Sequence, residues 1–209
     1  MTRFLVVALL IATAACSSNK PAATTTPAPT RVLAFAPQLR PGTTLVRQIQ
    51  ADMNGDGADE YAIWSQASSA PPGSVLRQSY VDVFDRRGDK LFTATEALTV
   101  DPKAVYQVPQ FFQFVTFDGK PDLVLGVQNE GASSGPLDIW VFSGVPLETA
   151  FKYSTTQDGQ LVADGNQLQL ITGSYKPADP MCCPSGMDHI VIGSRNGKIG
   201  IVGKTTTKS

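Results

Sequence analysis

The chain has 209 residues, with 17 basic and 18 acidic side chains and a formal net charge of −1 at pH 7. The sequence carries no basic stripe, so nucleic acid and anionic lipid headgroups are poor candidates for partners. Its 18 glycines and 15 prolines, with few helical periods, favour many short strands joined by turns and therefore an all-β, antiparallel fold.

The first residues predict export. Arg3 precedes the apolar run Phe4–Ala15, which is too short to span a bilayer as a stable helix and ends in small residues before Cys16. Residues 1–15 therefore resemble a bacterial lipoprotein signal, which implies lipidation of Cys16 and anchoring in the cell envelope. Ser17 implies sorting to the outer membrane where the organism has one. An ordinary secretory signal cleaved elsewhere is the alternative.

The next segment predicts a tether. Residues 16–34 are rich in Ser, Thr, Ala and Pro and show no apolar period, so they bury too little surface to offset the entropy of ordering. We expect a disordered linker here. A single β domain over 35–204 and a short tail at 205–209 follow.

Period-2 alternation predicts three similar units in this domain, at roughly 43–98, 105–152 and 158–204. Pro102 limits the only candidate helix, Thr95–Tyr106. The expected strands and hairpins are Thr44–Asp52, Glu60–Ser65, Tyr80–Ala94 with a turn at Arg87-Gly88, Phe111–Phe117, Leu123–Gln128, Leu137–Phe142, Asn166–Tyr175, and His189–Val202 with a type I′ turn at Asn196-Gly197.

The segment "DMNGDGADEY", residues 52–61, places four carboxylates close together between two expected strands. Such charges repel one another unless a positive group lies among them. Oxygen donors alternate along the segment, and Gly57 allows a sharp turn, which suits a hard cation with six to eight oxygen ligands. The lack of a nearby histidine or cysteine argues against zinc or copper.

The segment is not an EF-hand, because Ile63 stands where that motif needs a bidentate glutamate. The pattern D-x-N-x-D-G-x-x-E between strands resembles the calcium loops of FG-GAP/VCBS repeats, the blades of integrin-α-type β-propellers. This resemblance implies a Ca²⁺ site, with Asp59 outside the ligand set. The implied ligands are Asp52, Asn54, Asp56, the carbonyl of Ala58, and Glu60. The alternative is a solvated acidic turn that binds nothing.

The second unit repeats only the end of this pattern, as "DGKPD" at Asp118–Asp122. Phe114 and Thr116 occupy the first two ligand positions, so we expect no metal there. Propellers usually close with four to eight blades. Three units therefore predict blade-like sheets in a propeller-like or irregular β assembly.

The segment "KPADPMCCPSG" contains the adjacent residues Cys182 and Cys183. Its Asp-Pro-x-Cys-Cys-Pro-Ser pattern is similar to a segment of LppP/LprE-type bacterial lipoproteins. Three interpretations stay open: a strained vicinal disulfide, a thiol site with His189 as base, and two small structural residues. The C-x-x-C spacing of redox motifs is absent.

The sequence contains no G-x-S-x-G, no phosphate-binding glycine loop and no histidine–carboxylate pair near a serine, so we do not expect an enzyme. We expect a lipid-anchored envelope protein with a calcium-stabilised β domain that binds a protein or glycan partner. The alternative is a thiol-redox or hydrolytic accessory enzyme that uses Cys182, Cys183 and His189. A purely structural spacer is the third hypothesis.

Overall fold

The computed structural model describes residues 39–69, 77–94, 106–130, 134–157, 159–180 and 182–208. The chain divides into two units, Met1–Ala34 and Phe35–Ser209, and every described residue belongs to the second. The expected signal, Cys16, the tether, and all of the candidate helix Thr95–Tyr106 except its last residue lie outside the described residues. Within the described ranges, no helix is long and apolar enough to cross a membrane.

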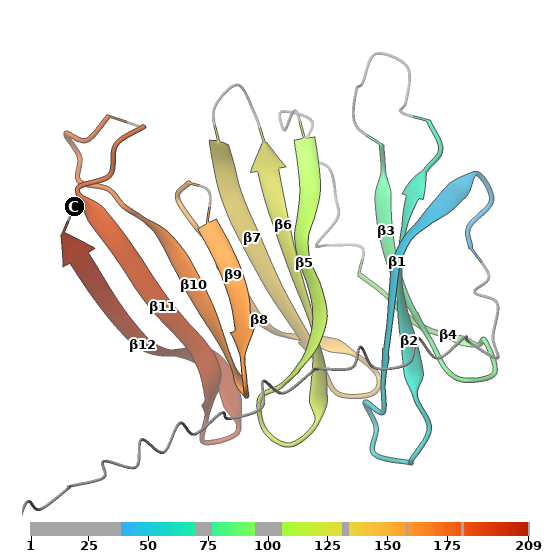
Figure 1. Ribbon diagram of the computed structural model, residues 1–209. Coiled ribbons are helices and arrows are strands. Elements are labelled where there is room, and N and C mark those ends of the chain that lie inside the picture. Colours follow the sequence, from blue (N-terminus) through green and yellow to red (C-terminus); the bar gives the residue numbers. More distant parts are fainter. Residues whose placement is uncertain are drawn as a thin grey trace, which may run out of the picture. The chain divides into compact units, whose positions relative to one another are not determined.

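The described residues form three antiparallel sheets of four strands each, which confirms the all-β, three-unit prediction (Figure 1). Sheet A contains β1 (Thr43–Ala51), β2 (Glu60–Ala67), β3 (Ser79–Phe84) and β4 (Lys90–Thr93). Sheet B contains β5 (Tyr106–Thr116), β6 (Pro121–Glu130), β7 (Ser134–Ser143) and β8 (Glu148–Ser154). Sheet C contains β9 (Gly159–Asp164), β10 (Gln167–Ser174), β11 (Gly186–Arg195) and β12 (Lys198–Lys208).

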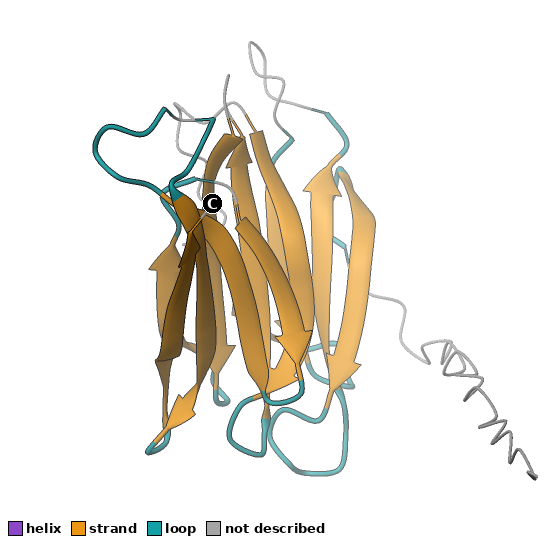
Figure 2. Cartoon of the chain, turned by 60° about the vertical axis from the view of Figure 1, so that its left-hand side comes forward, coloured by secondary structure: helices purple, strands orange, loops and turns teal. Residues whose placement is uncertain are grey.

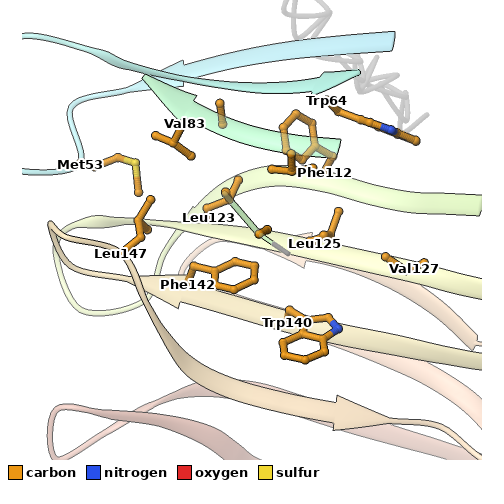
Figure 3. Packing of buried hydrophobic residues seen from close by; sticks show 13 residues of the cluster. Met53, Trp64, Val83, Phe112, Leu123, Leu125, Val127, Trp140, Phe142 and Leu147 are labelled. Atoms are coloured by element: carbon orange, nitrogen blue, oxygen red, sulfur yellow. The ribbon is translucent and has the colours of Figure 1, made fainter. Parts of the chain in front are cut away.

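Sheet B lies between the other two sheets and is buried on both faces. One cluster of buried side chains joins it to sheet A, and Figure 3 shows Trp64 and Val83 of sheet A opposite Phe112 and Leu123 of sheet B. A second cluster joins sheet B to sheet C, through residues such as Leu168 of β10. The sheets are therefore held together by two separate apolar layers.

Strand β6 shows how one sequence serves both layers. Leu123 and Leu125 point towards sheet A, whereas Val124 between them points towards sheet C. Side chains alternate across a strand, so a strand with two buried faces needs a continuous apolar run. The run "LVLGV" therefore belongs to a central strand of the middle sheet.

The sheets follow one another in the same orientation, as blades do. Strand β1 contacts β5, and β5 contacts β9, so the first strands of the three sheets are neighbours. Strand β8 contacts β12, so the last strands of sheets B and C are neighbours as well. In the described part of the chain, the sheets form an open series and not a closed barrel. The described loops gather at the two ends of the strands (Figure 2).

Two strands were not predicted from the sequence, β8 and β9. Both are edge strands whose side chains are mostly exposed, so they lack a regular apolar alternation. Strand β12 also extends to Lys208, beyond the expected end at Val202, because its polar end pairs with the start of β11. These segments are strands because they pair with a neighbouring strand, and not because their own sequence alternates between apolar and polar residues.

The two expected hairpin turns are present. Asn196 and Gly197 have φ angles of 54° and 71°, as the two central residues of a type I′ turn require. Strands β3 and β4 are joined by a turn in which Gly88 has a φ of 92°. The Asp85 carboxylate accepts hydrogen bonds from the N–H groups of Arg87 and Asp89 there, which fixes the turn.

An aspartate recurs on the third strand of every sheet, and this repeat was not recognised from the sequence. In each sheet the aspartate accepts a hydrogen bond from a hydroxyl residue directly opposite it on the fourth strand. The pairs are Asp82 with Thr93, Asp138 with Ser154, and Asp188 with Thr206. The three units therefore share one polar contact in addition to their strand order.

The recurring aspartates also show that the sheets face the same way. Asp188 lies on the face of β11 that points to sheet B, together with Ile190. Asp138 lies on the face of β7 that points to sheet A, together with Trp140. Asp82 lies on the opposite face of β3 from Val83, and so away from sheet B. Each aspartate therefore points towards the preceding sheet or towards the position that such a sheet would occupy.

Asp82 is the most deeply buried of the three and has three side-chain partners. Arg40 donates to both of its oxygens at 2.9 Å, Lys90 lies 3.2 Å away, and the Thr93 hydroxyl donates at 2.6 Å. Burial raises the pKa of Asp82, but the hydrogen bonds from Arg40, Thr93 and Lys90 outweigh that effect, so the pKa lies below its usual value. Asp82 thereby ties the segment before β1 to strands β3 and β4.

We expect Asp82→Asn to lower the free energy of unfolding at neutral pH by roughly 1.5–3 kcal/mol, because charge-assisted hydrogen bonds are lost. Because the folded pKa of Asp82 is depressed, its stabilisation is complete above the unfolded-chain value of about 3.9 and is lost as the pH falls through the folded pKa. The variant should therefore lose less stability on acidification than the wild type. Urea unfolding at a series of pH values measures this.

Asp164→Asn is the matched control, because Asp164 is an exposed residue at the end of β9. That variant should follow the wild-type dependence on pH. The same loss of stability on acidification in Asp82→Asn and in the wild type would contradict the assignment.

Candidate functional site

The acidic segment forms the loop between β1 and β2. Ala51 and Glu60 are the last cross-strand pair before the loop, so the residues between them leave the sheet. Gly55 and Gly57 have φ angles of 80° and 85°, in the left-handed region that favours glycine. Gly57 was expected to provide the sharp turn, and Gly55 provides a second one. The two glycines allow the loop to fold back on its own side chains.

Asp52 organises the first half of the loop. Its Oδ1 accepts hydrogen bonds from the N–H groups of Gly55 at 2.7 Å and Asp56 at 3.1 Å. Its Oδ2 accepts one from the N–H of Gly57 at 2.9 Å. Three backbone dipoles therefore point at one carboxylate, and they offset part of its charge.

Asn54 links the remaining side chains. Its Nδ2 group lies 2.9 Å from Glu60 Oε1 and 3.2 Å from Asp56 Oδ2, so one amide donates to both carboxylates. Its Oδ1 accepts the N–H of Asp56 at 2.7 Å, and Asp56 Oδ1 accepts the N–H of Ala58 at 2.8 Å. The Asn54 amide thereby joins the carboxylates of Asp56 and Glu60, two of the four expected side-chain ligands.

Glu60 is the buried member of the set, with 3% of its surface exposed. Burial raises the pKa of its carboxyl, and the nearby charges of Asp56 and Asp52 raise it further, against the lowering effect of hydrogen bonds from Met53 and Asn54. The Met53 side chain lies in the core between sheets A and B (Figure 3), and its N–H donates to Glu60 Oε2 at 2.8 Å. Met53 therefore fixes the loop over the carboxylate.

Ala58 and Asp59 form the half-buried end of the loop next to β2. Asp59 accepts a hydrogen bond from the Gln50 side chain of β1 at 2.9 Å, and so leans towards the strand. Ala58, whose carbonyl is an expected ligand, is half-buried beside it. These positions make Asp59 a suitable control residue for the loop.

No lysine or arginine of the described residues forms an ion pair with Asp52, Asp56 or Glu60. The Asn54 amide and backbone N–H groups are the positive partners that the loop provides for itself. Among the residues that the structure describes, no three Asp, Glu, His or Cys side chains form a ready-made metal cluster. The oxygens of the loop are of the type that a hard cation takes, but their lone pairs face N–H donors. Calcium binding stays a prediction.

The corresponding turns of the other sheets are shorter. The β5–β6 turn occupies residues 117–120, and the β9–β10 turn only residues 165–166. Phe114 and Thr116, at the first ligand positions of the second unit, lie within β5 itself. The β1–β2 loop, residues 52–59, is the longest of the three and is the one with room for several ligands.

Asp122 takes the place of Glu60 in the second unit, and it was not singled out from the sequence. It is 1% exposed, and burial raises its pKa together with the charge of Asp118, against the lowering effect of a hydrogen bond with Ser143. Its Oδ2 atom has no hydrogen-bond partner among the described residues. The parallel endings "DGADE" and "DGKPD" were the sequence signal for this equivalence.

Cys182 and Cys183 lie in the β10–β11 loop, at the opposite end of sheet C from the β9–β10 turn (Figure 1). Both thiols are exposed and free, and their Sγ atoms are 2.8 Å apart. His189 lies within β11, where it pairs with Ile171 and Thr205. Among the contacts of the described residues, none joins His189 to either cysteine.

No family model matches the chain, and neither a curated protein nor a solved structure matches it.

Proposed function

We propose that the chain is an exported envelope lipoprotein, anchored through Cys16, whose β domain is a non-enzymatic binding module for a protein or glycan and is stabilised by Ca²⁺ in the β1–β2 loop. In this proposal, the domain is a module of the FG-GAP/VCBS repeat type. Its role is to present loops on a rigid stack of sheets. Outer-membrane sorting applies where the organism has that membrane.

The observation that carries this proposal is the charge of the β1–β2 loop. Glu60 is nearly fully buried beside Asp52 and Asp56, and no cationic side chain of the described residues offsets these charges. A bound cation would offset the burial and the carboxylate repulsion that together raise the pKa of Glu60. Asp52, Asn54, Asp56, the Ala58 carbonyl and Glu60 would hold it, and it would supply positive charge that fixes the loop between β1 and β2.

The arrangement of the loops on the stacked sheets supports a binding function over a catalytic one. Loops are the usual place for recognition residues because a rigid scaffold holds them in position. Two apolar layers hold the three sheets, and the β1–β2 loop extends from this scaffold with Met53 as its apolar anchor. The hydrolytic form of the rival enzyme needs His189 as a base next to the cysteines, whereas His189 pairs within sheet C and shares no hydrogen bond with either thiol among the described residues.

The anchor has its own test. Cys16→Ser should abolish incorporation of a fatty-acid probe and leave the signal uncleaved or the protein released from the membrane, because the acylated thiol is gone. Cys182→Ser is the matched control, since its thiol lies in the folded domain, and it should be labelled as the wild type is. Unchanged labelling of Cys16→Ser would overturn the anchor.

The binding function is tested by capture from envelope extract with the immobilised full-length chain, in calcium and in EDTA. We expect a partner protein or glycan to be retained by the wild type in calcium and released by EDTA, because the cation orders the β1–β2 loop. Asp59→Ala should retain the partner, and Asp56→Ala should lose it. The calcium-dependent part of the retained set should not change when reductant is added.

Two results would contradict this function. One is the same retained set for wild type and Asp56→Ala in both calcium and EDTA. The other is a retained set without any calcium-dependent partner, in which every partner resists denaturant and is released only by reductant; this would favour the thiol-redox alternative.

A further inference from the structure

The loop that carries Cys182 and Cys183 is fixed by one carboxylate. Asp179 Oδ2 accepts the N–H groups of Lys176 at 2.7 Å and Ser185 at 2.9 Å, and Asp179 Oδ1 accepts the Ser185 hydroxyl at 2.6 Å. The N–H of Cys183 also donates to the carbonyl of Pro180 at 3.0 Å. Asp179 thus joins the start of the loop to its end, and the cysteines lie on the closed part between them.

The ends of this loop pack tightly on sheet C. A Cβ atom at Gly173 would lie 2.5 Å from the Tyr175 ring and 3.2 Å from Pro184, so these side chains cover the glycine. A Cβ atom at Gly186 would lie 2.3 Å from the carbonyl oxygen of Thr207 on β12. The loop therefore leaves the sheet from a close-packed base, which holds the cysteines at a defined position.

The two thiols are placed for reaction with each other. Both are exposed, and their Sγ atoms are 2.8 Å apart, within hydrogen-bond distance. A covalent S–S bond, at about 2.05 Å, would need only a small further approach. The hydrogen bond with Cys182 and the charge of Cys182 raise the pKa of Cys183. Loss of both protons at once is therefore disfavoured.

We propose that Cys182 and Cys183 form a reversible redox pair that exchanges with a disulfide, either a low-molecular-weight disulfide or a disulfide of another protein. This site lies outside the β1–β2 loop and does not depend on the proposed calcium-stabilised function. The cysteines act without His189, because exchange needs only an accessible thiolate and a second thiol within reach.

The exchange takes place in two steps. The thiolate of one cysteine attacks a sulfur of the partner disulfide, which breaks the partner's S–S bond and releases one partner thiolate. The second cysteine, as thiolate, then attacks the mixed disulfide and closes the Cys182–Cys183 bond, with release of the second partner thiolate. Two electrons pass from the cysteine pair to the partner, and the two protons of the cysteines end on the released thiols.

The adjacent positions make this bond reversible. Neighbouring Cα atoms are about 3.8 Å apart across a trans peptide, below the roughly 4.4–6.8 Å that most disulfides span. Strained and exposed disulfides are the easily reduced ones. Among the described residues no third His, Cys, Asp or Glu joins the two sulfurs, which is short of the four ligands that structural zinc takes. The geometry therefore favours exchange over metal binding.

The test is alkylation and mass analysis of the peptide that contains both cysteines, after the full chain is equilibrated in EDTA with excess oxidised glutathione. We expect this peptide of the wild type to lose both alkylatable thiols and the mass of two hydrogens, to carry no glutathione, and to recover both thiols in dithiothreitol. Cys182→Ser and Cys183→Ser should each accumulate a glutathione adduct on the remaining cysteine.

Other outcomes overturn the proposal. These are two alkylatable thiols in the oxidised wild type, a stable glutathione adduct on it, or a bond that dithiothreitol does not reduce. If a variant fails to fold, the wild-type measurement decides alone. Incubation of Cys183→Ser with envelope extract distinguishes the sources, because a protein disulfide gives a reducible cross-link and a low-molecular-weight disulfide gives only a small adduct.

Discussion

Burial of sheet B on both faces is the constraint on which the rest of the structure depends. Leu123, Val124 and Leu125 are fully buried, alternate between the two apolar layers, and each contribute roughly 1.5–3 kcal/mol. Sheets A and C each have one face covered by sheet B, so neither layer exists without the middle sheet. This stacking brings the β1–β2, β5–β6 and β9–β10 turns to one end of the sheets (Figure 1), and so it decides where the acidic loop lies.

The sequence was sufficient to predict the strands that bury side chains. Strands β2, β3, β6, β7, β10 and β11 are central, and their apolar patterns reflect one or two buried faces. Edge strands β8 and β9 were not predicted because hydrogen bonds to a neighbouring strand hold them. The alternation of apolar and polar residues in a sequence reflects burial and not strand pairing. The aspartate–hydroxyl pairs escaped because the pairing of Asp138 with Ser154, for example, depends on register between strands, which a single sequence does not show.

The candidate site was predictable in outline for a different reason. Spacing along one short loop is a local property, so Asp52, Asn54, Asp56 and Glu60 were selected from the sequence, and the structure places their side chains together. Two features depend on the folded environment and were not predicted. Met53, between two polar positions, is an apolar anchor, and the side-chain oxygens are turned onto N–H donors of the loop. The loop is therefore organised by its own backbone, with its charge only partly offset.

The most direct test of the proposed calcium site is the thermal stability of the full chain in EDTA and in excess calcium. Binding to the folded state should raise the free energy of unfolding by about 2.7 kcal/mol at a calcium concentration about 100 times the dissociation constant. Asp56→Ala should lose most of this gain, and Asp59→Ala, whose side chain bonds to Gln50, should keep most of it. An unchanged wild-type midpoint in EDTA and calcium, with elemental analysis showing no retained metal, would contradict the site. An equal loss in Asp59→Ala would contradict the ligand assignment.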